Sequence, residues 1–77
     1  MSDPAILSSN VDLIYAISQA KKRARRIGSQ VWICDDGALF WMTDEYPEGA
    51  HIAARVYPDG RVWVKGEYSD LLHEVQP

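Results

Sequence analysis

The chain lacks most of the features that cross-link small proteins, anchor them in membranes or direct their export. It has a single cysteine, Cys34, so no disulfide forms within its 77 residues. Its apolar runs are short, which excludes a membrane-spanning helix. The N-terminus lacks the basic and then apolar pattern of a secretory signal, and we therefore expect a cytoplasmic protein.

Groups for catalysis and metal binding are also scarce. The two histidines, His51 and His73, stand far apart and there is no second cysteine, which excludes the usual zinc sites. No phosphate-cradling glycine pattern is present. Asp35 and Asp36 beside Cys34 disfavour a reactive thiolate, so we interpret Cys34 as a strand residue that packs. We expect a non-enzymatic protein without metal or cofactor.

What remains is the composition of a small globular protein. The chain is 47% hydrophobic and 25% charged, which differs from the composition of disordered chains. It has no internal repeat, low-complexity tract or linker. These features predict a single domain over residues 1–77.

The apolar spacing predicts an amphipathic helix over residues 10–27. Ser9 with Asp12 forms a possible capping box at its start, with Asn10 as a competing cap. Gly28 marks the end, because glycine readily takes the left-handed conformation there. The apolar arc of this helix contains Leu13, Ile14, Ala16, Ile17, Ala20, Ala24 and Ile27.

After Gly28 the sequence pattern changes to that of strands. Residues 30–35 and 38–43 are rich in β-branched and aromatic side chains, and an Asp-Asp-Gly sequence between them predicts a tight hairpin turn. A two-residue loop pairs Ile33 with Phe40, whereas a three-residue loop pairs Ile33 with Leu39. The sequence leaves both registers open.

A second hairpin joins residues 51–57 to residues 61–65 through the turn Pro-Asp-Gly. Alternation places Ile52, Ala54 and Val56 on one face of its first strand. A three-residue loop predicts four cross-strand pairs: Val56 with Val62, Ala54 with Val64, Arg55 with Trp63, and Tyr57 with Arg61. The predicted fold class is α+β, with one amphipathic helix packed on a small antiparallel sheet of three or four strands.

The basic run of residues 21–26 is the first candidate interaction surface. Its cations lie away from the apolar arc, where they would contact nucleic acid or an acidic partner. The alternative is a solvated helix face, with cations near the C-terminus where the helix dipole favours them. The candidate residues are Lys21, Lys22, Arg25 and Arg26.

The aromatic side chains of the predicted sheet are the second candidate. One helix covers only one face, so the other face carries some of the aromatics, beside two arginines. Trp, Tyr and Arg are the residues most enriched at binding hot spots, and such a face also suits stacking on unpaired bases. The alternatives are that these aromatic side chains enlarge the core or form a homodimer interface. The candidate residues are Trp32, Arg55, Tyr57, Arg61 and Trp63.

Acidic residues in or near two loops are the third candidate. If they converge, they present a negative patch to a basic protein groove; otherwise they serve turn chemistry and solubility. The set is Asp35, Asp36, Asp44, Glu45 and Glu48.

Two segments resemble a known family. The helix segment Ser18-Gln19-Ala20-Lys21-Lys22 and the hairpin Tyr57-Pro58-Asp59-Gly60-Arg61-Val62-Trp63-Val64 are similar to the helix-then-sheet layout of small phage-encoded anti-CRISPR proteins. The resemblance implies a non-enzymatic inhibitor that docks on a host defence ribonucleoprotein. It also implies that the helix cations face a nucleic-acid-binding groove.

The distribution of charge keeps both partner classes open. Residues 1–27 carry five cations and two acids (+3), and residues 28–77 carry three cations and nine acids (-6), so the net charge of -3 conceals a basic helix beside an acidic sheet. We expect a protein-binding module, an inhibitor from a phage or mobile element that acts on a host protein or ribonucleoprotein such as a CRISPR-Cas complex. The alternative is a small nucleic-acid-binding regulator that uses the basic helix.

Overall fold

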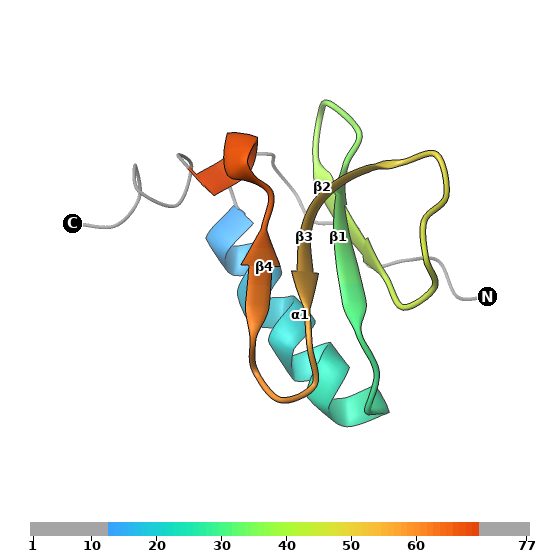
Figure 1. Cartoon of the computed structure of the whole chain (residues 1–77), viewed down its shortest axis with the longest axis vertical. Helices are drawn as coiled ribbons and strands as arrows, with labels where there is room; N and C mark the ends of the chain where they lie inside the picture. The colour runs from blue at the N-terminus through green and yellow to red at the C-terminus, as the bar shows by residue number, and fades with distance from the viewer. Residues whose placement is uncertain (1–12, 70–77) are drawn as a thin grey trace.

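The computed structural model describes residues 13–69 and shows an α+β fold with one main helix and one antiparallel sheet (Figure 1). The predicted fold class is confirmed, with four strands in the sheet. The strands lie in the order β2-β1-β3-β4, and α1 packs against β1, β2 and β3. The elements are α1 (Leu13–Ile27), β1 (Val31–Asp35), β2 (Phe40–Thr43), β3 (His51–Val56) and β4 (Val62–Val64).

Helix α1 contacts the sheet mainly through small side chains. Ala16, Ala20 and Ala24 are fully buried at helical spacing, which lets the helix backbone approach the sheet closely. Ile14 and Ile27, which the sequence placed on the apolar arc, are each 38% exposed. Ile14 lies in the first turn of α1 and at the margin of the apolar arc, and Ile27 is the last helical residue.

The end of α1 is the one that the sequence predicts. Gly28 has a φ of 70°, and its N–H donates to the carbonyl oxygen of Ala24 at 2.8 Å. This left-handed residue satisfies a terminal carbonyl and turns the chain towards β1. The predicted caps Ser9 and Asn10, with Asp12, and also His73 in the tail, lie outside the described residues.

The β3–β4 hairpin has the predicted register. Val56 pairs with Val62, Arg55 with Trp63 and Ala54 with Val64. The Tyr57 N–H donates to the Arg61 carbonyl oxygen at 2.9 Å, which closes a three-residue loop. Gly60 in this loop has a φ of 97°, a conformation that favours glycine.

Both predicted registers of the β1–β2 hairpin are wrong. Ile33 pairs with Met42, and Asp35 pairs with Phe40. The Asp36 N–H donates to the carbonyl oxygen of Leu39 at 3.2 Å, so the two-residue turn is formed by Gly37 and Ala38 and is shifted towards β2 relative to the centre of the Asp-Asp-Gly sequence. The Asp36 carboxylate accepts hydrogen bonds from the Ala38 and Leu39 N–H groups and holds the chain in this later turn.

A β-bulge in β3 overturns the predicted alternation of that strand. Ile33 pairs with Ala54 and Cys34 with Ile52, so Ala53 is an extra residue without a partner in β1. The bulge reverses the side-chain alternation, because paired residues share a face. Ile52 therefore lies on the same face as Cys34, opposite to Ala54 and Val56.

The core fills the space between α1 and the inner face of the sheet. The buried strand residues of this face include Val31, Ile33, Phe40 and Met42. Tyr68, from the helical turn after β4, closes one end: its ring packs edge-on against Phe40, and its hydroxyl donates to Asp35 Oδ2 at 2.8 Å. Burial, followed by this contact with Asp35, raises the pKa of Tyr68 to about 12.

Within residues 13–69, no helix combines the length and the apolar character that crossing a membrane requires.

Candidate interaction surface

The face of the sheet opposite α1, here called the outer face, carries a row of large side chains. Thr43 pairs with Trp32, Trp32 with Arg55, and Arg55 with Trp63, so these residues follow one another across all four strands. Their side chains share one face because directly paired residues point to the same side of a sheet. The expectation that one sheet face retains aromatics away from the helix is confirmed.

Arg55 lies at the centre of this row and contacts aromatic groups. Its guanidinium carbon is 5.8 Å from the ring centroid of Trp63 and 5.9 Å from that of Tyr57. Its Nη1 donates to the Tyr57 hydroxyl at 3.0 Å. These contacts fix a rotamer-rich cation in one place, which lowers the entropy that a partner would have to remove on binding.

Trp63 and Tyr46 are the most exposed aromatic side chains on this side among the described residues. Trp63 is 46% exposed on the edge strand β4, and Tyr46 in the loop between β2 and β3 is 65% exposed. β2 and β3 run in the same direction on either side of β1, so this loop has to run back past β2 and cross over β1 to reach β3 (Figure 1). Tyr46 packs edge-on against Trp32, with ring centroids 5.8 Å apart, which places the loop on the outer face.

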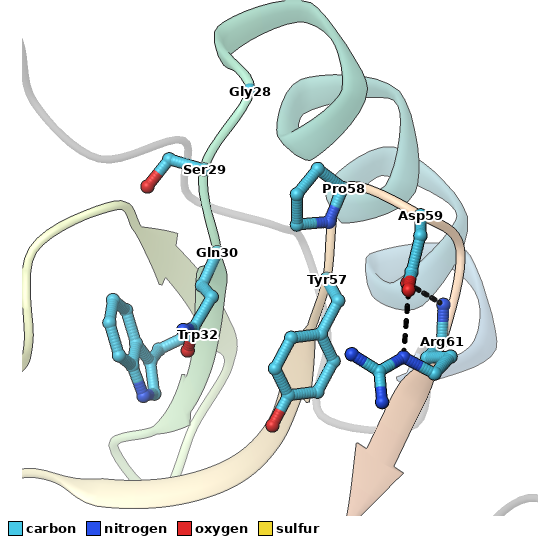
Figure 2. Close-up of a pocket in the computed structure, with 8 residues that line it drawn as sticks. All are labelled: Gly28, Ser29, Gln30, Trp32, Tyr57, Pro58, Asp59 and Arg61. Atoms are coloured by element: carbon cyan, nitrogen blue, oxygen red, sulfur yellow. Dashed lines mark hydrogen bonds and ion pairs between the residues drawn. The ribbon is translucent and has the colours of Figure 1, made fainter.

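Two shallow hollows flank the row. The first, of about 430 Å³, lies between the turn after α1 and the β3–β4 loop. Figure 2 shows Tyr57 between Trp32 and Arg61 there, with Asp59 bound to Arg61. The Arg61 Nε donates to Asp59 Oδ2 at 2.8 Å, and the Arg61 guanidinium lies 4.7 Å from the centroid of the Tyr57 ring.

The second hollow, of about 270 Å³, lies on the other side of Arg55 and is called the basic hollow below. Its cations come from β3 and from the residue after β4, and its exposed aromatic rings come from β4 and the β2–β3 loop. Sequence reasoning missed Tyr46, Ile52 and Lys65 here. Simple alternation places Ile52 on the inner face, and the bulge moves it to the outer face. Tyr46 lies in a polar loop whose path is known only once the strand order is known. The hollow is lined by Tyr46, Ala50, His51, Ile52, Arg55, Trp63 and Lys65.

The structure separates the predicted site residues into two surfaces. Trp32, Arg55, Tyr57, Arg61 and Trp63 come together on the outer face. The four helix cations do not join them, because α1 packs on the opposite face of the sheet and these side chains are exposed on it. The cations of this helix surface are Lys21, Lys22, Arg25 and Arg26.

The acidic side chains whose contacts the structure shows accept hydrogen bonds from backbone N–H groups in turns. Asp36 accepts backbone N–H groups of Ala38 and Leu39, and these hydrogen bonds lower the pKa of its carboxyl group. The N–H of Arg61 acts in the same way on Asp59 and lowers its pKa, assisted by the charge of Arg61. Asp35 accepts hydrogen bonds from the Gly37 N–H and from the Tyr68 hydroxyl.

Cys34 is buried on the outer face between Trp41 and Ile52, its partners on the neighbouring strands. Burial raises the pKa of its thiol to about 11. The described residues 13–69 contain no group of three or more His, Cys, Asp or Glu side chains placed to hold a metal ion.

Comparisons with protein-family models, curated proteins and solved structures give no match to this chain.

Proposed function

We propose that the protein is a non-enzymatic protein-binding module that docks on its partner through the outer face. The observation that carries this proposal is the row Trp32–Arg55–Trp63, which lies on the sheet face that α1 leaves uncovered. Interfaces derive most of their binding energy from a few Trp, Tyr and Arg side chains near the centre of the patch. Here such side chains are already packed against one another, with Trp63 exposed at the edge.

The chemistry of the described residues supports a binder rather than a catalyst. The Cys34 thiol is buried and its pKa is raised, which opposes nucleophilic use. The carboxylates of Asp36 and Asp59 are engaged by backbone N–H groups of their own turns. The more specific proposal, an inhibitor of a host protein or of a ribonucleoprotein such as a CRISPR-Cas complex, rests on the sequence resemblance alone.

Affinity capture tests the proposal directly. The tagged chain is incubated with host lysate beside Trp63→Ala and a control, Tyr15→Ala. Tyr15 is a suitable control because it is 54% exposed on α1, away from the outer face. Loss of a hot-spot tryptophan costs about 2 kcal/mol or more, a roughly 30-fold loss of affinity.

We expect the wild-type chain and Tyr15→Ala to recover one stoichiometric partner that Trp63→Ala loses. Absence of any stoichiometric partner, or equal recovery by Trp63→Ala, contradicts the proposal. Circular dichroism of the three proteins checks that each is folded.

The helix surface carries a second candidate function. Lys21, Lys22, Arg25 and Arg26 are exposed together on α1, an arrangement that suits phosphate contacts. A nucleic-acid-binding regulator of this kind predicts binding that weakens steeply as salt is added, and it uses the side of the molecule opposite to the outer face.

A further inference from the structure

The basic hollow has a charge opposite to that of the chain as a whole. The formal net charge is -3, yet the charged side chains among the residues that line the hollow are the cations Arg55 and Lys65. None of the described residues that line it carries a carboxylate. The hollow therefore presents positive charge beside the exposed rings of Trp63 and Tyr46.

Arg55 differs from the other cations of the outer face in its partners. Arg61 pairs with Asp59 at 2.8 Å, and Lys65 lies 3.7 Å from Glu67. Within residues 13–69, Arg55 pairs with no carboxylate; its contacts are the Tyr57 hydroxyl and two aromatic rings. Its Nε is buried without an acceptor in the same part of the chain. A partly buried cation without an anion is costly, and an incoming carboxylate relieves that cost.

We infer that the outer face recognises a segment of a protein partner from which one Asp or Glu carboxylate enters the basic hollow and pairs with Arg55. The inference rests on the proposed function and names the chemistry of the partner. The aliphatic part of the acidic side chain and its apolar neighbours pack on Trp63 and Tyr46. Hydrogen bonds between a guanidinium and a carboxylate are among the strongest that proteins form.

The surroundings of the hollow favour a single carboxylate over a phosphate backbone. Asp44, Glu45 and Glu48 flank Tyr46 in the same loop, and Asp59 and Glu67 partly neutralise the neighbouring cations. A nucleic acid carries a charge at every phosphate and meets these acids along its length. One carboxylate inserted beside Arg55 interacts with the positive hollow at short range.

Selection from a library of random dodecapeptides displayed on phage tests the inference, because the peptides that bind reveal the side-chain chemistry that the outer face selects. The immobilised baits are the full chain, Arg55→Gln and the control Tyr15→Ala. We expect Asp and Glu to be enriched about twofold or more over the unselected library on the wild type and on Tyr15→Ala, and not on Arg55→Gln. In the best peptide, replacing its Glu or Asp by the amide is expected to weaken binding to the wild type roughly tenfold or more.

The amide peptide keeps the test valid even where Arg55→Gln fails to fold, because that measurement uses only the wild-type chain. Selected peptides without acidic enrichment, equal enrichment on Arg55→Gln, or an amide peptide of equal affinity each overturn the inference. So does oligodeoxythymidine binding that Arg55→Gln abolishes, which assigns the hollow to phosphate. If a captured partner depends on Trp63 but the selected peptides are not acidic, the proposed function still holds and this inference alone is overturned.

Discussion

At the scale of single residues, Cys34 and Trp63 show that a shared sheet face does not produce a shared environment. Both point to the outer face, but Cys34 lies on the central strand β1 and Trp63 on the edge strand β4. The sequence predicted correctly that Cys34 packs. The reason it offered was the acidic neighbours Asp35 and Asp36, whereas the cause of the raised pKa is burial. Burial depends on the position of Cys34 between β2 and β3, which local sequence does not reveal.

The buried thiol predicts slow alkylation. Raising the pKa from 9.0 to about 11 lowers the thiolate fraction near neutral pH roughly a hundredfold, and the thiolate is the reactive form. We expect iodoacetamide to modify the native chain at least about a hundredfold more slowly than the urea-unfolded chain. The native rate rises about tenfold per pH unit below about pH 11, where the folded thiol is half ionised, and levels off above that pH.

A matched control places a cysteine on the surface. Ala38 is exposed in the β1–β2 turn, so Ala38→Cys in a Cys34→Ala background supplies an accessible thiol on the same fold. Mass spectrometry over time measures both rates. Modification of native Cys34 as fast as that of the control cysteine contradicts the buried position.

At the scale of elements, the two hairpins explain what the sequence could predict. In β3–β4, the proline and glycine of the turn and the alternating valines favour one register, and that register is observed. In β1–β2, two aspartates precede the glycine, and their carboxylates engage three successive backbone N–H groups, which shifts the turn towards β2. The bulge at Ala53 left no signal, because an Ala-Ala pair fits either face of a strand.

The end of α1 gives a stability prediction. Gly28 has a φ of 70°, and a side chain placed there meets no atom within 4 Å. The cost of Gly28→Ala is therefore conformational, about 1 kcal/mol of the free energy of unfolding. For a domain of this size, that loss lowers the Tm by roughly 4–8 °C. Urea and thermal unfolding followed by circular dichroism measure the change.

Gly66→Ala is the matched control for this prediction. A side chain at Gly66 also meets nothing within 4 Å, but Gly66 does not have the left-handed backbone conformation. It begins a helical turn, where alanine is favoured over glycine, so we expect unchanged or higher stability. Equal losses at Gly28 and Gly66 contradict a conformational role for Gly28.

At the scale of the whole molecule, the sheet separates two candidate surfaces that the sequence could not place relative to each other. The sequence supplied the aromatic and basic residues, and a helix-then-sheet order predicts that only one sheet face is covered. The basic hollow was not predictable, because it needs the β2–β3 loop to cross β1 and the bulge to turn Ile52 outward. Among the described residues, the cations of the helix surface thus lie on one side of the sheet, and Arg55 is a positive centre on the other side.

This separation predicts that the two surfaces respond independently to mutation. The double charge reversal Lys22→Glu with Arg26→Glu changes only exposed positions of α1, on the far side of the sheet from Trp63. We expect it to leave capture of the outer-face partner within about twofold of wild type, since effects at distant sites are independent. Negative charge near the helix C-terminus itself costs up to about 1 kcal/mol of stability, so Lys22→Gln with Arg26→Gln serves as a neutral control for stability.

Fluorescence anisotropy with labelled duplex and single-stranded DNA at low salt completes the measurement. If the charge reversal removes the captured partner as fully as Trp63→Ala does, the interaction lies on α1. If DNA binding depends on salt and only the charge reversal abolishes it, the helix surface has a nucleic-acid-binding function.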